Sequence, residues 1–171
     1  MTKRLRRILM VAGAAAAAFV AQAVPAQAAI SDGMYKNLRV VASGAPCFAP
    51  QSGSWGATVR AVPCNGSSSN WQAIPISGTD SRGGAWYVFE WLPNSGCLVP
   101  NWTTVGSPVV VSGPCGNVTG GDYAWYGWPE GSAYELVNGG NTNLVLDMDV
   151  STGRLQVWTA NYGNNQKWFV S

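Results

Sequence analysis

The chain repeats itself three times, and this repetition constrains its fold more than any other feature. The matching segments are Gly44–Pro50, Asn94–Pro100 and Thr142–Met148, followed further on by Val59–Cys64, Val110–Cys115 and Leu155–Ala160. The copies are offset by 50 and 48 residues, and each copy closes on a tryptophan. A repeat of this length is one supersecondary unit that buries its apolar face only against its neighbours. We therefore expect three packed copies.

The segments between the turns are typical of an all-β fold. Short apolar or alternating runs are separated by clusters of Gly, Pro, Asn and Ser, and no amphipathic helical pattern follows residue 28. In the third copy, Leu146, Met148 and Val150 are expected to face one way. Asp147 and Asp149 are expected to face the other way, toward solvent. Loss of the Asp147 side chain is therefore expected to leave the melting temperature nearly unchanged.

The cysteines predict two disulfides. The four cysteines are Cys47, Cys64, Cys97 and Cys115. Four cysteines allow three connectivities, but the nearly equal spacings of 17 and 18 residues favour Cys47–Cys64 and Cys97–Cys115. Val145 and Ala160 replace both cysteines in the third copy, as the joint loss of a pair predicts. A metal site is disfavoured because the chain has no histidine and no Cys-x-x-Cys.

Residues 1–28 are predicted to be a secretory signal peptide. A basic head, Lys3–Arg7, precedes the apolar run Ile8–Val24, and Ala26-Gln27-Ala28 provides the small-residue cleavage pattern. A membrane anchor is the alternative, but the run is short and rich in alanine. The Arg6-Arg7 pair suggests twin-arginine export, although general secretion fits better. The mature protein is thus expected to be extracellular.

The mature chain, residues 29–171, is expected to be weakly acidic. The leader holds four of the ten basic residues, which leaves six basic against eight acidic ones and a net charge of −2. No basic patch suited to phosphate follows the leader. The sequence therefore predicts no nucleic-acid partner, and no membrane association once the signal is removed.

Three motifs of the third copy resemble those of the ricin B-type lectins. Val145-Leu146-Asp147, Leu155-Gln156-Val157-Trp158 and Asn165-Gln166-Lys167-Trp168 are similar to the Cys-Leu-Asp, Gln-x-Trp-x-Cys and Asn-Gln-x-Trp elements of that family. The resemblance, to small secreted actinobacterial-like members, covers about residues 33–171. It implies an all-β fold, a β-trefoil with a six-stranded barrel, a hairpin cap and two intra-repeat disulfides.

The resemblance also assigns positions within the repeats. The implied repeats span about 33–78, 79–130 and 131–171, and their closing tryptophans are expected in the core. These tryptophans are Trp71, Trp125 and Trp168.

The resemblance implies a sugar site in the third copy. Asp147 would accept hydrogen bonds from two neighbouring hydroxyls, and Trp158 would stack on the apolar face of the sugar ring. Asn165 would bind the same hydroxyl pair, Gln166 would hold that network, and Gln156 would support the pocket wall. In the competing interpretation, Asp147 caps a turn and Asn165 fills a loop.

The first two copies lack this constellation, so one site is expected. They have Ala49 and Val99 at the position of the acid, and Val62 and Gly113 at the position of the tryptophan platform. The hairpin Val150–Arg154 is about four residues shorter than the family usually has, which leaves the choice of sugar open. The aromatic segment 117–128 would either form a different surface or close a barrel end.

These features favour a monomeric carbohydrate-binding protein without cofactors that binds galactose-, xylose- or glucose-type glycans. Catalysis is not expected, because the chain has no histidine for a Ser-His-Asp arrangement. Asp147 and Asp149 also lie on one strand face instead of opposing each other across a cleft. The alternative is a non-catalytic protein-binding trefoil, such as a secreted protease inhibitor, which would use Thr79–Gly84 as an exposed rigid loop.

Overall fold

The computed structural model describes residues 30, 33–35, 37–42, 44–64, 66–79, 85–118 and 120–170. The predicted signal segment and residues 80–84 of the candidate inhibitor loop lie outside this part. The regular structure here consists of β-strands and single 3₁₀ turns, as predicted for an all-β protein. No helix among the described residues is long and apolar enough to cross a membrane.

The strands fall into three groups of four, preceded by the short strand β1 (Gly33–Tyr35). The first group is β2 (Leu38–Val40), β3 (Cys47–Pro50), β4 (Ala57–Val62) and β5 (Trp71–Thr79). The second is β6 (Ala85–Trp91), β7 (Gly96–Pro100), β8 (Val109–Pro114) and β9 (Trp125–Glu130). The third is β10 (Ala133–Asn138), β11 (Leu144–Asp149), β12 (Arg154–Thr159) and β13 (Lys167–Val170).

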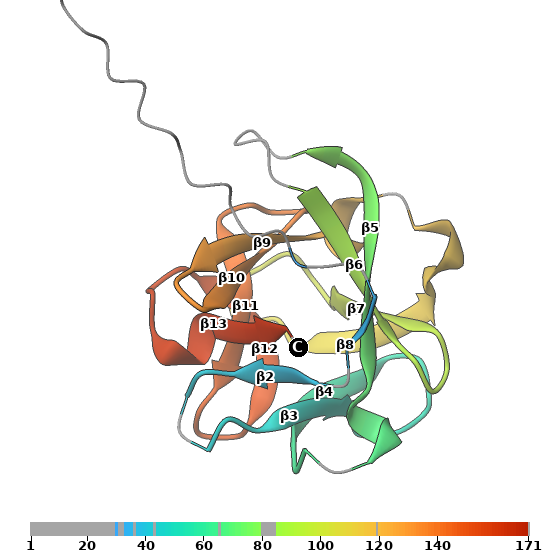
Figure 1. The fold of residues 1–171 in the computed structure, drawn as a ribbon, viewed down its shortest axis with the longest axis horizontal. Helices are drawn as coiled ribbons and strands as arrows, with labels where there is room; N and C mark the ends of the chain where they lie inside the picture. The colour runs from blue at the N-terminus through green and yellow to red at the C-terminus, as the bar shows by residue number, and fades with distance from the viewer. Residues whose placement is uncertain are drawn as a thin grey trace, which may run out of the picture.

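The first and last strands of each group form a barrel (Figure 1). Antiparallel pairs run in the order β2–β13–β10–β9–β6–β5. The last edge is covered by β1, which pairs with β5 just before the chain enters β2. The two middle strands of each group form the hairpins β3–β4, β7–β8 and β11–β12.

The three hairpins contact one another through equivalent positions. The cross-strand contacts between copies are Thr58–Val110, Pro108–Gln156 and Arg154–Arg60. Each copy contributes two residues to these contacts, and the two lie two positions apart in the sequence. They are Thr58 and Arg60 in the first copy, Pro108 and Val110 in the second, and Arg154 and Gln156 in the third. The hairpins are therefore related by pseudo-threefold symmetry, and one residue of each hairpin pairs with a residue of the next hairpin.

The closing tryptophans anchor the core in the same way in each copy. Their indole N–H groups donate to the backbone carbonyls of Phe48, Leu98 and Leu146, at 2.8, 2.9 and 3.0 Å for Trp71, Trp125 and Trp168 respectively. All three rings are fully buried. A buried indole N–H needs such an acceptor, because leaving it unpaired would be costly. The predicted core position of the tryptophans is confirmed.

Both predicted disulfides are present. Cys47–Cys64 and Cys97–Cys115 join residues whose Cα atoms are 4.9 and 5.2 Å apart. In the third copy the corresponding Val145 is buried in a small apolar cluster against which Ala160 packs. An apolar contact therefore replaces the staple there.

The second hairpin carries an extra residue, which corrects one predicted equivalence. A register shift between Gly96 and Cys97 makes Ser112 the cross-strand partner of Cys97. Val145 has Trp158 as its partner at the same position. Ser112, and not Gly113, is therefore the second-copy equivalent of the predicted stacking tryptophan, because the bulge displaces Gly113 by one position.

Candidate functional site

The candidate site lies on the outer face of the β11–β12 hairpin. Cross-strand partners on this face are Val145 with Trp158, Asp147 with Gln156, and Asp149 with Arg154. The alternate residues of the hairpin, including Leu146 and Met148, are buried in the main core. The predicted alternation is thus observed within the strand.

Val150 departs from this pattern. Its side chain is 72% exposed, whereas the alternation placed it on the core side with Met148. The reason is that β11 ends at Asp149 and Val150 opens the turn. Side chains alternate between the two faces only within the strand, so the pattern does not apply beyond its last paired residue.

Asp147 is buried and makes three side-chain hydrogen bonds. One carboxylate oxygen accepts from Gln156 Nε2 at 2.9 Å. The other accepts from Asn165 Nδ2 at 2.8 Å and from Gln166 Nε2 at 2.9 Å. Only 3% of Asp147 is exposed, so the expectation of a solvent-facing side chain was wrong. The 3₁₀ turn Asn164–Gln166 contacts β11 and brings the two amides onto the carboxylate.

Gln166 ties this cluster to the preceding loop. Its side chain is fully buried, and its carbonyl oxygen accepts from the backbone N–H of Asn161 at 2.7 Å. Its amide also donates to the backbone carbonyl of Thr159 at 3.1 Å. Gln166 therefore contacts both the loop and the carboxylate.

The two carboxylates of the hairpin titrate in opposite directions. Burial raises the pKa of Asp147 above its ordinary value of 3.8, although the hydrogen bonds from Gln156 and Gln166 act against this shift. Asp149 is exposed, and the hydroxyls of Thr152 and Ser151 lower its pKa to about 2. Asp147 is therefore the carboxylate that acidification protonates first.

A shallow cavity of about 220 Å³ opens beside this cluster. Its lining residues are Asp147, Met148, Asp149, Val150, Gln156, Trp158, Asn161 and Asn165. Trp158 is 40% exposed, so its ring is available for contact. The cavity is smaller than the roughly 300–1,000 Å³ typical of drug-sized pockets.

The second copy supports the Trp158 ring. Gly106, in the β7–β8 loop, approaches so closely that a Cβ there would lie 3.3 Å from the indole Cζ3 atom. Its φ of +81° is one that favours glycine. The Gly106 N–H also donates to the Val157 carbonyl at 2.8 Å. This contact, which the sequence analysis missed, holds the ring from a neighbouring copy.

The short hairpin turn is stabilised by Asp149. Its carboxylate accepts from the N–H and hydroxyl of Ser151 at 2.9 and 2.7 Å, and from the Thr152 hydroxyl at 2.6 Å. Gly153 closes the turn with a positive φ of +67°. In the competing interpretation Asp147 caps a turn. In the structure it is Asp149 that caps this turn.

The first two copies present different groups at the site positions. Ala49 faces Arg60, and Val99 faces Val110, where the third copy pairs Asp147 with Gln156. Neither copy provides a carboxylate at this point. The absence of a carboxylate in both copies was predicted from the sequence, whereas the arginine opposite Ala49 was not.

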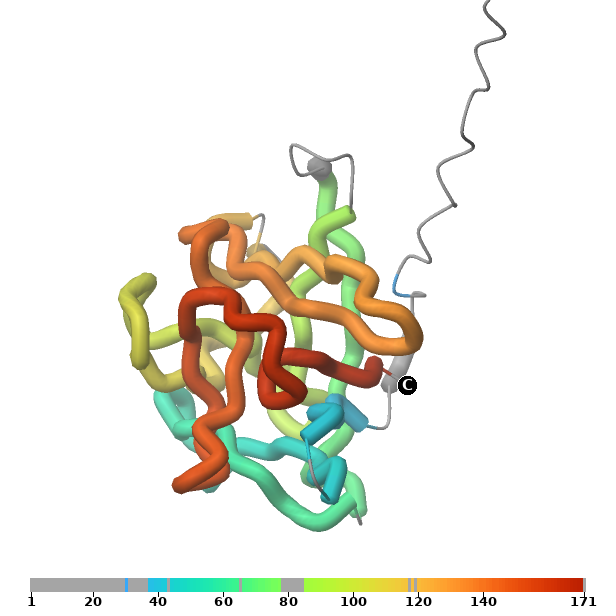
Figure 2. The backbone as a smooth tube through the Cα atoms, turned by 90° about the vertical axis from the view of Figure 1, so that its left-hand side faces the viewer, coloured from blue at the N-terminus to red at the C-terminus, as the bar shows by residue number. Residues whose placement is uncertain are grey.

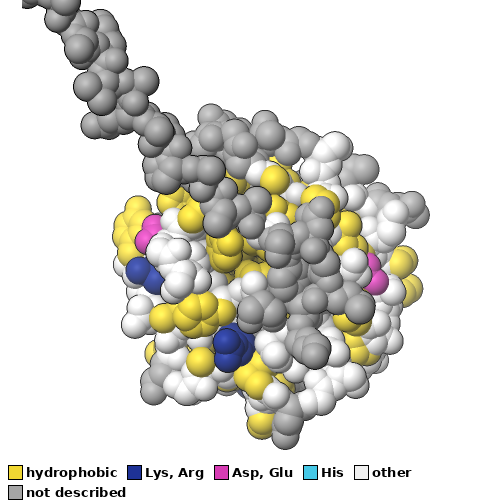
Figure 3. Space-filling view, viewed as in Figure 1, with side chains coloured by type: hydrophobic (Ala, Val, Ile, Leu, Met, Phe, Trp, Pro, Cys, Tyr) yellow, Lys and Arg dark blue, Asp and Glu magenta, His cyan; other side chains and the backbone are white. Residues whose placement is uncertain are grey.

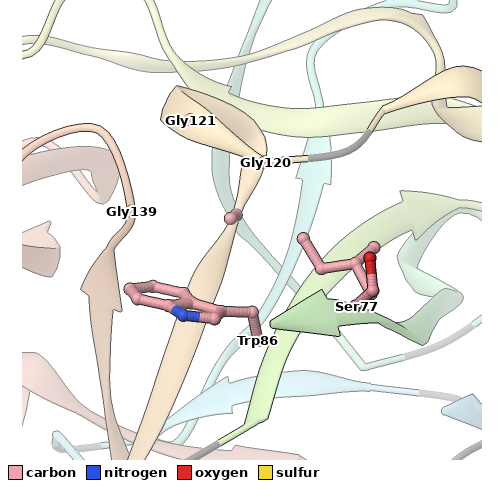
Figure 4. A pocket seen from close by; sticks show the side chains of 7 residues that line it. Ser77, Trp86, Gly120, Gly121 and Gly139 are labelled. Atoms are coloured by element: carbon pink, nitrogen blue, oxygen red, sulfur yellow. The ribbon is translucent and has the colours of Figure 1, made fainter. Parts of the chain in front are cut away.

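A second cavity, of about 260 Å³, lies away from the hairpin (Figure 4). Trp86 projects from β6 toward Gly139, and Ser77 and the Gly120-Gly121 pair border the same space. The aromatic segment of the second copy packs behind it: the Tyr126 ring contacts the Trp86 and Trp128 rings at centroid distances of 5.8 and 5.9 Å. Among the described residues no charged side chain lines this cavity, so its chemistry is less specific than that of the Asp147 cluster.

Sequence comparisons give no family. No protein-family model matches the chain, and no curated protein matches it. Comparison of structures is more informative. The designed threefold-symmetric protein ThreeFoil superposes with a TM-score of 0.67 at 21% identity, over 82% of this chain and 99% of the designed one. The fold is a β-trefoil.

Natural trefoils superpose equally well. The Rhizoctonia solani agglutinin gives a TM-score of 0.66 at 15% identity, covering 82% of this chain and 94% of its own. An exo-β-1,3-galactanase from Clostridium thermocellum gives 0.67 at 17% identity, over 80% of this chain but only 29% of the enzyme. At these identities the similarity establishes the trefoil fold alone.

Proposed function

We propose that this chain is a secreted bacterial lectin of the ricin B type that binds a glycan through one site in its third repeat. The observation that carries this proposal is the Asp147 carboxylate, held by three amides beside the half-exposed ring of Trp158. Such a pairing of polar acceptors with an aromatic face fits a pyranose, which has an apolar face and a hydroxyl edge.

The hydrogen-bonding capacity of the cluster fits a sugar hydroxyl pair. An ionised carboxylate accepts about four hydrogen bonds, and the amides of Gln156, Asn165 and Gln166 use three of them. One hydroxyl donates to the remaining lone pair of Asp147. The Asn165 side chain, at the cavity wall, accepts or donates to the neighbouring hydroxyl while the sugar ring stacks on Trp158.

The trefoil relatives support this class of ligand, since they include an agglutinin and a galactanase. Galactose-, xylose- and glucose-type glycans all fit a site of this composition. We propose binding without catalysis, because the Asp147 carboxylate is occupied by structural amides and Asp149 caps a turn. We also propose that the protein is a monomer. A protein-binding trefoil is the alternative to glycan binding, and the test below distinguishes the two.

The test of this proposal is a glycan array combined with a pull-down on insoluble polysaccharides. The wild-type protein should be retained on at least one glycan. Trp158→Ala should weaken this binding at least tenfold, as expected for a central aromatic contact. Trp55→Ala is the matched control, because Trp55 is 64% exposed on the first hairpin and should not affect binding. No retention of the wild type would favour a protein-binding trefoil.

The raised pKa of Asp147 predicts how binding depends on pH. Only the ionised carboxylate accepts from a sugar hydroxyl while keeping all three amide bonds, so protonation should release the sugar. Because burial raises the pKa of Asp147, affinity should already fall while the pH is above 3.8. Calorimetry from neutrality down to this pH, with circular dichroism to monitor folding, measures the effect. Affinity that persists to pH 3.8 and fails only near 2 would implicate Asp149 instead.

A further inference from the structure

We propose that the preferred ligand is an acidic glycan, whose carboxylate or sulfate group is bound by Arg60 and Arg154 beside the third-repeat cavity. This inference rests on the proposed function and specifies its substrate class. It starts from the contact between the first and third copies, where two arginines meet.

Arg60 and Arg154 are direct cross-strand partners in the β4–β12 pair. Side chains of such partners project from the same face of the sheet, and like charges placed opposite each other destabilise it. The equivalent contacts between the other copies are Thr58–Val110 and Pro108–Gln156, neither of which carries a charge. The arginine pair is therefore not required by the trefoil architecture. Figure 2 shows the third-copy hairpin reaching the first-copy strands at this point.

The two guanidinium groups have few hydrogen-bond partners in the described part of the chain. The Nε atoms of Arg60 and Arg154 are buried without a hydrogen-bond acceptor there, and no ion pair between described residues involves either arginine. Arg154 Nη2 makes one long contact, at 3.4 Å, with Gln156 Oε1. Asp149 is the cross-strand partner of Arg154, but its carboxylate accepts from Ser151 and Thr152.

The first copy shows how this cationic pair arises. Arg60 occupies the position that Gln156 holds in the third copy, and its partner Ala49 occupies the position of Asp147. The first copy has thus lost the carboxylate and gained a cation. The hydrogen-bond acceptor of the third copy is thus replaced by a cationic hydrogen-bond donor in the first.

The pair lies next to the proposed sugar cavity. Arg154 contacts Gln156, whose amide donates to Asp147, and Gln156 lines the cavity. A glycan with one residue on Trp158 can therefore place an acidic substituent, or the next residue, on the arginines. Guanidinium groups bind carboxylate and sulfate oxygens through paired, charge-assisted hydrogen bonds.

Charge is otherwise sparse on this protein. The mature chain is weakly acidic overall, and the face in Figure 3 shows charged side chains only as small, separated groups. Arg39 is the useful comparison, since its Nε also lacks an acceptor in the described structure. Its guanidinium instead lies 5.8 Å from the centroid of the Phe169 ring, and its cross-strand partners are uncharged.

The test compares matched neutral and acidic glycans by calorimetry at low salt. Suitable pairs are lactose with 3′-sulfolactose, and xylotetraose with its glucuronate-branched form, which separate sulfate from carboxylate. The acidic member of at least one pair should bind about tenfold more tightly. Arg60→Gln should reduce it to the affinity of the neutral member, whereas Arg39→Gln should not. Equal affinities within both pairs would overturn the inference and leave the proposed function intact.

A second measurement does not depend on glycan binding. Titration with inorganic sulfate should shift the Nε–H resonances of Arg60 and Arg154 saturably in NMR spectra, while that of Arg39 should follow only bulk salt. Identical behaviour of all three arginines would contradict the anion site. Saturable shifts together with silence on every glycan would support the anion site and refute the sugar-binding proposal.

Discussion

Replacing Asp147 with alanine is expected both to abolish glycan binding and to destabilise the fold by about 2–5 kcal/mol. Two of the amides that donate to this carboxylate, those of Gln156 and Gln166, are buried. A buried donor left without its acceptor costs about 1–3 kcal/mol, and alanine removes an acceptor from both amides, although the Gln166 amide keeps its bond to the Thr159 carbonyl. Urea unfolding gives the stability, and calorimetry with the best oligosaccharide gives the binding.

Asp149→Ala is the matched control for this variant. It removes a carboxylate two residues further along the same strand, whose partners are exposed turn hydroxyls. It should lose far less stability, because the hydroxyls that it leaves are exposed to water. An Asp147→Ala protein that is as stable as the wild type would contradict the buried cluster, and one that still binds would contradict the assigned site.

Trp168→Ala should have the largest effect on stability, a loss of about 3–5 kcal/mol or more. The ring is fully buried, packs edge-on against Phe48 at a centroid distance of 5.1 Å, and donates to the Leu146 carbonyl. Truncation would leave a cavity and an unpaired carbonyl at the point where the first and third copies meet. Denaturant unfolding measures this loss.

Trp158→Ala provides the comparison, because its ring is 40% exposed. It should lower the unfolding free energy by much less than Trp168→Ala. If the two substitutions cost the same, the distinction between a structural and a binding tryptophan would be wrong.

Features that repeat along the chain could be predicted from the sequence. The matched spacings identified both disulfides, and the repeated closing tryptophans, together with the family resemblance, identified Trp71, Trp125 and Trp168 as core residues. These succeed because each feature is local to one copy and occurs in at least two. Burial of a polar side chain could not be read in this way. Alternation placed Asp147 on the correct face of β11, but its burial depends on a 3₁₀ turn 18 residues later.

Contacts between copies were also beyond sequence reasoning. The support of Trp158 by Gly106 and the pairing of Arg60 with Arg154 each join residues about 50 or more positions apart. They follow from how the hairpins register around the threefold axis, which no single repeat encodes. The bulge in the second hairpin could not be predicted either. It inserts one residue, so that Ser112 and not Gly113 takes the position equivalent to Trp158.

The central claim, a single glycan site in the third repeat, is tested most directly by isothermal titration calorimetry with the best oligosaccharide from the array. One shallow site should bind at about the millimolar level, with a stoichiometry of one. The Trp158→Ala protein, still folded, should give no measurable binding under the same conditions. A stoichiometry of two or three, or a Trp158→Ala variant that binds like the wild type, would contradict the account.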